Sequence, residues 1–218
     1  MIVVVGLPVY TDSPDGEKCA GGLAVEVASA ASLRGAKVEL VGKVGDDGAG
    51  DAVVVALGRL GIGHAALLRD PARPTPVLAA AVVDADTAEV EDEGAEARLL
   101  PEDPVTRPAL EAADVEMALH YLPGAGVVIL ADPGSEAAVA AGVEGAAFAG
   151  ARLIVLVPAG TKPPSVPAGA TVLEALADDD GSFGRLVGLF AGALDAGVDP
   201  AAAFREAVSA SGWEPVVD

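Results

Sequence analysis

The sequence has few of the residues on which metal centres and nucleophilic sites commonly depend. It contains one cysteine, Cys19, and two histidines, His64 and His120, among 218 residues. A single cysteine cannot form a disulfide within the chain and cannot build a cysteine-based zinc site. Neither histidine lies in a catalytic motif, and we assign neither a role. The sequence therefore predicts no metal site and no disulfide framework.

Basic residues are also scarce. Lysine and arginine number 13 against 33 acidic residues, which gives a formal net charge of −20. A field of this sign repels nucleic acid and anionic membranes, so we expect neither as a partner. An acidic surface that stays soluble at high salt, as in a halophilic source, is one interpretation, and lineage bias is the other.

Long uncharged apolar runs are missing as well. No stretch of 18 or more apolar residues lacks a charge, so we expect no transmembrane helix. The opening residues 1–6 lack a basic region and are typical of a first strand, not of a signal peptide. We therefore expect a cytoplasmic protein.

Aromatic residues make up only 3% of the chain, although hydrophobic residues make up 52%. The core must therefore consist mainly of valine, leucine and alanine. A chain of this length and composition can bury a sizeable core, and we expect one domain over residues 1–218.

Segments typical of strands and helices alternate along most of the chain. The expected strands are 2–5, 37–41, 127–130, 153–157 and 171–173. The expected helices are 20–33, 51–60, 110–122, 136–149, 182–196 and 200–210. Asp199 and Pro200 are a favourable cap and first residue for the last helix. Alternation predicts an α/β fold of three layers, αβα, around a mostly parallel sheet. A β-rich segment at 76–100 predicts a small additional sheet.

Two glycine motifs lie at expected turns between strands and helices. Gly21 and Gly22 precede the first helix, and residues 41–50 read VGKVGDDGAG. Glycine permits tight turns and close backbone approach. Either motif alone is a generic βα turn.

Together and in this order, the motifs resemble the N-terminal signature of the ribokinase-like (PfkB) carbohydrate kinases. The resemblance continues through residues 73–75, through the β-rich segment and through GARLIVLVPA at 150–159. It implies a ribokinase-like fold in which residues 76–100 form a lid over a sugar and make a homodimer contact. It also implies ATP and Mg²⁺, provided that the chain is an active kinase.

The resemblance assigns sugar-binding roles to residues near the first helix and the second glycine motif. The family has an asparagine where this chain has Glu26, whose carboxylate can still accept hydrogen bonds from hydroxyl groups. Asp12 is the candidate for the family's early aspartate, although its spacing differs by one residue. The implied sugar-binding residues are Asp12, Gly21, Gly22, Glu26, Gly45 and Asp46.

The family's last motif is altered here. In the family it reads D-T-T-G-A-G-D, where a helix N-terminus holds phosphate and the final aspartate is the general base. The base position is Gly184, and Phe183 replaces the second glycine. The implied anion hole is Gly181, Ser182, Phe183 and Gly184. Asp178 and Asp180 are weak candidates for a substitute base.

The chain is also short before this motif. Family members carry an N-x-x-E element and further nucleotide-binding structure there, whereas Glu174 is preceded at the asparagine position by Thr171. We therefore favour a catalytically degenerate homologue that binds a sugar or polyol. An active sugar or nucleoside kinase with a substitute base and an unrelated small α/β binding protein are the alternatives.

Overall fold

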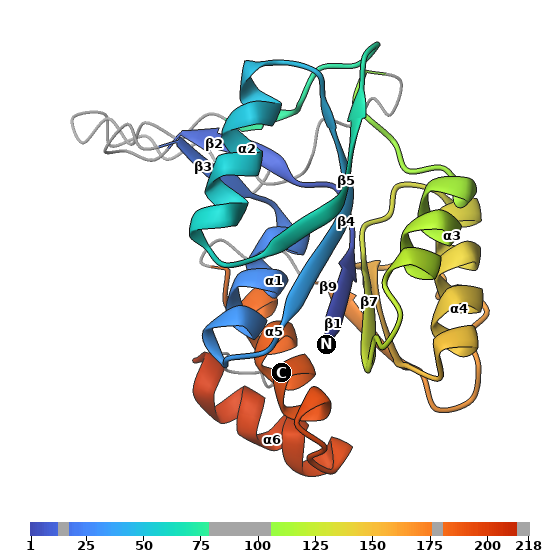
Figure 1. Cartoon of the computed structure of the whole chain (residues 1–218). Helices are drawn as coiled ribbons and strands as arrows, with labels where there is room; N and C mark the ends of the chain where they lie inside the picture. The colour runs from blue at the N-terminus through green and yellow to red at the C-terminus, as the bar shows by residue number, and fades with distance from the viewer. Residues whose placement is uncertain (13–17, 79–105, 176–180, 213–218) are drawn as a thin grey trace.

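The computed structural model describes residues 1–12, 18–78, 106–175 and 181–212. Its centre is a sheet of six parallel strands in the order β5-β4-β1-β7-β8-β9 (Figure 1). The strands are β1 (Ile2–Val5), β4 (Val38–Gly45), β5 (Gly63–Asp70), β7 (Val127–Ala131), β8 (Arg152–Pro158) and β9 (Thr171–Ala175).

Each central strand is buried on both faces, as its nearly continuous apolar sequence predicts. Successive residues of β1 alternate between two cores: Ile2 and Val4 pack into one, and Val3 and Val5 into the other. Side chains point to opposite faces with a period of two. The sheet therefore needs helices on both sides.

Helices cover both faces of the sheet (Figure 1). One face carries α1 (Leu23–Leu33), α2 (Gly48–Arg59), α5 (Ser182–Asp195) and α6 (Pro200–Ser211). The other face carries α3 (Ala112–Tyr121) and α4 (Glu136–Ala149). The predicted three-layer αβα fold is confirmed, and α6 begins as expected, with the Asp199 side chain accepting hydrogen bonds from Ala201 N and Ala202 N.

A second, small sheet has the order β3-β2-β6. It contains β2 (Val9–Asp12), β3 (Lys18–Gly21) and β6 (Val77–Leu78), so β2 and β3 belong to it although they precede the first helix. Of the expected lid at 76–100, residues 79–100 lie outside the described part of the chain.

Three predictions of local structure were incomplete. The helix expected from residue 20 begins at Leu23, because residues 18–21 pair with β2 instead. β2 itself was not predicted. β5 was also not predicted, because HAALLRD is rich in alanine and leucine, and its pairing with β4 overrides that preference.

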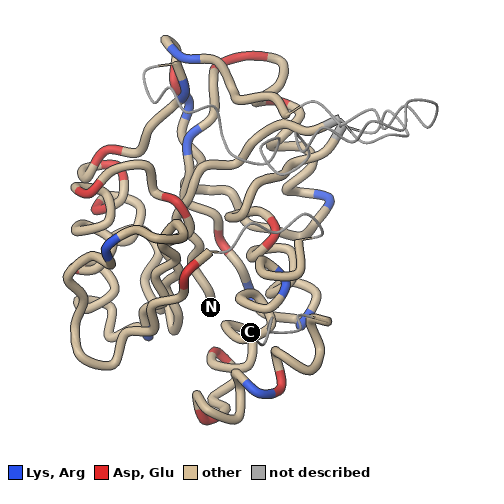
Figure 2. The backbone as a smooth tube through the Cα atoms, turned by 180° about the vertical axis from the view of Figure 1, so that it is seen from behind, with Lys and Arg blue, Asp and Glu red and all other residues tan. Residues whose placement is uncertain are grey.

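The described chain contains no helix that is both long and apolar enough to cross a membrane. Figure 2 shows acidic positions spread around the described chain, with fewer basic positions among them. In this view, the acidic positions of the described residues do not gather on one side.

Candidate functional site

The sheet reverses its order between β1 and β7, which are neighbours at its centre. In open α/β sheets, ligands bind outside the carboxyl ends of the strands at such a switch point. Gly6 follows β1 here, and a Cβ atom at this position would overlap the Ala131 carbonyl at the end of β7. The close approach of the two strand ends therefore requires glycine at position 6.

The Gly21-Gly22 pair lies beside this point. Gly22 is the N-cap of α1 and has a φ of 89°, a conformation that favours glycine. A Cβ atom at position 22 would lie 3.5 Å from the carbonyl oxygen of Leu7, the second residue after β1. The glycine pair thus brings the start of α1 against the carboxyl edge of the sheet.

Glu26, on the first turn of α1, meets the start of α5. A Cβ atom at position 184 would lie 2.7 Å from the Glu26 Cβ and 2.8 Å from its Oε2. A Cβ atom at Gly181, the N-cap of α5, would lie 3.5 Å from the same oxygen. The Glu26 carboxylate therefore lies at the N-terminal end of α5, in the space that a side chain at position 184 would use.

Small residues allow α1 and α5 to approach this closely. Gly184 and Gly188 lie one turn apart on α5, and a Cβ atom at position 188 would lie 2.6 Å from the Ala30 Cβ. Residues four apart share a helix face. Gly184, the position to which the resemblance assigns the catalytic base, is therefore part of the contact between the two helices.

The Phe183 ring points into the core and not toward the end of α5. Its side chain is 5% exposed and packs into the core formed by α1, α5 and the sheet. The group that lies at the end of α5 is the Glu26 carboxylate. The two candidate substitute bases, Asp178 and Asp180, lie outside the described residues.

The second glycine motif builds a separate network at the start of α2. Asp47 caps this helix by accepting a hydrogen bond from Gly50 N at 2.8 Å. It also accepts hydrogen bonds from the backbone N and the Oγ1 of Thr75, both at 2.8 Å. Thr75 Oγ1 in turn accepts a hydrogen bond from Gly45 N at 2.9 Å. The motif therefore ties the β4–α2 turn to the segment after β5.

The electrostatics of this turn also indicate a structural role. Burial alone would raise the pKa of Asp47, but the hydrogen bonds from Gly50 and Thr75 and the nearby Arg69 charge together hold it below its ordinary value. Asp46 is exposed, and its backbone N donates to the Asp70 carbonyl. The hydrogen bonds of the predicted sugar ligands Gly45 and Asp46 thus link this turn to β5 and to Thr75 after it.

The other predicted sugar ligands fall into two groups. Gly21 and Gly22 lie at the start of α1, and Glu26 lies between that start and the start of α5. Asp12 ends β2, and its side chain is not among those described.

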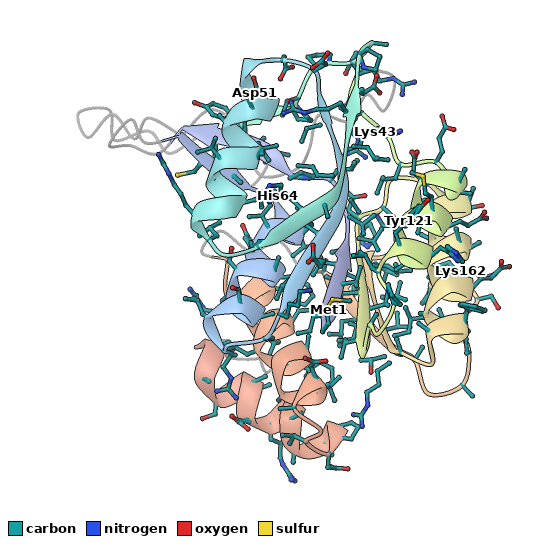
Figure 3. All side chains as sticks on the ribbon, in the orientation of Figure 1. Met1, Lys43, Asp51, His64, Tyr121 and Lys162 are labelled. Atoms are coloured by element: carbon teal, nitrogen blue, oxygen red, sulfur yellow. The ribbon has the colours of Figure 1, made fainter. Side chains whose placement is uncertain are left out.

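Figure 3 shows the two edges of the sheet. Lys43 and Asp51 lie toward the carboxyl edge, and Met1 lies toward the amino edge.

Sequence reasoning missed a charged pair at the switch point. Asp132 follows β7 directly, and its Oδ2 lies 3.6 Å from Nη1 of Arg107. The sequence does contain a signal for Asp132, because an aspartate directly after a buried central strand is expected at the carboxyl edge of the sheet. Arg107 gave none, because it lies in an irregular stretch between the lid segment and α3.

The described residues do not fit the nucleotide and metal that the resemblance implies. The end of α5 faces a carboxylate where a phosphate would bind, and position 184 has no proton acceptor. β9 ends at Ala175 and α5 begins at Ser182, so the segment that joins them is short. Within the described ranges, no cluster of three or more histidine, cysteine or acidic side chains could hold a metal ion.

Comparison with protein families gives one match. The family described as pfkB family carbohydrate kinase matches residues 8–174. The matched range includes both glycine motifs and ends before residues 178–184. No curated protein matches the sequence.

Several solved structures share the fold. A sugar kinase from Pyrococcus horikoshii, solved with ATP, aligns with a TM-score of 0.54 at 18% identity, over 74% of this chain and 54% of its own. Arabidopsis thaliana ribokinase, solved with ribose and ATP, aligns with a TM-score of 0.67 at 15% identity, over 96% of this chain and 90% of its own. The aminoimidazole riboside kinase of Salmonella enterica aligns with a TM-score of 0.50 at 17% identity, over 72% of this chain and 49% of its own. The chain thus spans about half the length of the first and third of these proteins.

Proposed function

Because this chain belongs to the pfkB family of carbohydrate kinases, we propose that it binds a sugar or another small polyol and does not phosphorylate it efficiently. The binding site is the carboxyl edge of the sheet between the starts of α1 and α5.

The position of the Glu26 carboxylate carries this proposal. A helix N-terminus attracts anions because its free backbone N–H groups and its dipole present partial positive charge. Here a carboxylate of the chain itself already lies beside Gly181 and Gly184. A phosphate group brought to the same place would meet a like charge. Two unit charges 4 Å apart repel by about 4 kcal/mol at an effective dielectric constant of about 20.

The same carboxylate suits a neutral polyol. A carboxylate accepts hydrogen bonds from several hydroxyl groups, and such charge-assisted bonds are stronger than neutral ones. Gly22, at the start of α1, is partly exposed. These features support hydroxyl recognition without help from a nucleotide.

A second candidate function is sugar phosphorylation with Glu26 as the general base. The observation that favours it is that the Glu26 Oε2 lies 2.8 Å from where a Cβ at position 184 would be. The carboxylate lost from α5 would then be replaced by one from α1. A general base contributes about 10²–10⁴-fold to such a reaction. This candidate still requires a phosphate donor for which the described residues offer no site.

The chain also offers a route to self-association. The small sheet contains β3 and β6 as its outer strands, and Val77 is 54% exposed on β6. Strand edges bind further strands readily. We infer a homodimer through the small sheet, which light scattering during size-exclusion chromatography would test.

Binding measurements test the proposal directly. Isothermal titration of the purified chain with neutral sugars, polyols and nucleosides should reveal at least one ligand, whereas ATP with Mg²⁺ should give no heat of binding. Glu26→Gln should weaken polyol binding by about tenfold or more, because a neutral amide replaces a charged acceptor. Glu144→Gln, an exposed position on α4, removes the same charge as a control and should leave binding unchanged.

Two results would contradict the proposal. One is tight binding of ATP with Mg²⁺ to the wild-type chain. The other is polyol binding that is equally strong in Glu26→Gln, which would show that the ligand lies elsewhere.

A further inference from the structure

Asp132 has an unusual backbone at the switch point. Among the residues that the structure describes, it is the one non-glycine residue with a positive φ, at 62°. Such conformations are uncommon outside glycine, and they are concentrated at functional sites. The residue immediately follows β7, so its carboxylate lies at the carboxyl edge of the sheet.

Arg107 is held against this aspartate. Its side chain is 16% exposed, and its Nη1 lies 3.6 Å from Asp132 Oδ2, beyond hydrogen-bond distance. No hydrogen bond joins the guanidinium to another described residue, although the group carries five N–H donors. Lys43, by contrast, is engaged by Asp114 at 2.5 Å. Arg107 is therefore positioned by charge while its donors remain available to a further acceptor.

The Asp132 loop and the predicted polyol site flank the same residue, Leu7. A Cβ atom at Gly134 would lie 3.4 Å from Leu7 Cδ1, and one at Gly22 would lie 3.5 Å from the Leu7 carbonyl oxygen. Leu7 itself is 4% exposed. The loop at Gly134 and the start of α1 at Gly22 therefore both pack against Leu7, at the carboxyl edge of the sheet.

From this juxtaposition we propose that the ligand is a polyhydroxylated anion, whose carboxylate or phosphate binds Arg107 while its hydroxyl groups bind at Gly22 and Glu26. The proposal rests on the proposed function, and it adds the chemical class of the ligand. A guanidinium matches the geometry of carboxylate and phosphate groups by donating two parallel hydrogen bonds. The anion binds on the α3 side of the switch point, away from the Glu26 carboxylate at the start of α5.

Matched ligands test this proposal. Calorimetric titration would compare glucose with gluconate and glucose 6-phosphate, and ribose with ribonate and ribose 5-phosphate. In the wild-type chain, one of the anions should bind about tenfold or more tightly than its neutral parent. The carboxylate and phosphate members of each set show which anion the site takes.

Two substitutions of Arg107 sharpen the test. Arg107→Gln should remove the preference for the anion, leaving the affinity for the neutral parent unchanged. Arg107→Lys should keep part of it, because charge remains but the paired donors are lost. Arg152→Gln, an exposed position at the start of β8 on the opposite edge of the sheet, lowers the net charge equally and should keep the full preference. Thermal melting without ligand checks that each variant is folded.

The outcomes separate this inference from the proposed function. Binding of neutral and anionic partners with equal affinity, or an anion preference that survives in Arg107→Gln, overturns the inference and leaves the polyol site standing. If no compound in either set binds the wild-type chain, both are overturned for these ligands.

Discussion

The starts of α2 and α5 both lie at the carboxyl edge of the sheet, and they differ in how their first turns are capped. α2 is capped by its own Asp47, which also accepts two hydrogen bonds from Thr75. α5 begins at Gly181, whose φ is 70°, without a side-chain cap from that residue. The carboxylate beside α5 comes from Glu26, on another helix.

The α2 start lies within the range that matches the family, whereas the α5 start lies beyond it. The α2 motif is retained in sequence, and its polar groups are satisfied by one another. The α5 motif departs at Phe183 and Gly184 from the motif that the resemblance implies. Under the proposed function, this departure is what prevents efficient phosphorylation.

The largest expected effect comes from breaking the α2 start. Asp47→Ala removes the acceptor for Gly50 N, Thr75 N and Thr75 Oγ1. Loss of the helix cap together with partly buried donors left unsatisfied should lower the free energy of unfolding by about 3 kcal/mol. Urea unfolding followed by circular dichroism measures the change.

Asp46→Ala is the matched control one residue away. The Asp46 side chain is exposed, so its loss should change stability by less than about 0.5 kcal/mol. Equal losses for the two substitutions would mean that the network around Asp47 does not hold the turn together.

A smaller effect should follow from restoring the family residue on α5. Gly184→Asp places a Cβ 2.7 Å from the Glu26 Cβ and sets two carboxylates side by side. We expect a loss of about 2 kcal/mol from overpacking and like charge. Adding Glu26→Asn, which removes the second charge, should recover about half of that loss. Chemical unfolding of the wild type, the two single variants and the double variant gives the interaction free energy between positions 26 and 184.

Gly48→Asp controls for the glycine replacement itself. No atom lies within 4 Å of a Cβ at position 48, and an acidic side chain is favourable in the first turn of a helix. Its stability should therefore stay at or above that of the wild type. Additive losses in the Gly184 and Glu26 variants would show that the two positions do not interact.

The smallest effect should appear in the pH dependence of stability. Hydrogen bonds from Ala72 and Arg73 hold the pKa of Asp70 below its ordinary value, and the pKa of Asp47 is likewise lowered. Because the folded state favours both charged forms, these carboxylates stabilise the fold above about pH 4, and the contribution is lost as the pH falls through their folded pKa values.

Urea midpoints measured from about pH 6 down to about pH 3 test this. Asp47→Asn should weaken the acid dependence, whereas the exposed Asp46→Asn should keep it. An acid dependence unchanged in Asp47→Asn would show that this carboxylate does not couple protonation to folding.

Much of the fold could be predicted from the sequence, because short apolar runs and capped helices are local signals. The strand at 2–5 and the helix at 136–149 match the structure in full. β5 could not be predicted in this way, since its alanines and leucines favour a helix and only pairing with β4 makes it a strand. At β5, pairing with a neighbouring strand therefore outweighs the local helix propensity of the sequence.

The site was less predictable than the fold. Glu26 and Gly184 were each predicted as site residues. The Glu26 carboxylate lies beside Gly184 only because α1 packs against α5, and the sequence does not show that packing. The ion pair of Arg107 with Asp132 likewise joins residues whose proximity only the topology determines. The sequence motifs indicated candidate residues, but which of those residues lie close together depends on the tertiary structure.

The most direct test of the central claim, that the start of α5 no longer supports phosphoryl transfer, is a product assay. The purified chain would be incubated with ATP, Mg²⁺ and the sugar that binds it, and the sugar would be examined by mass spectrometry. We predict no phosphorylated sugar above a protein-free control. Phosphorylated sugar that disappears in Glu26→Gln would contradict the claim and show that Glu26 has replaced the lost base.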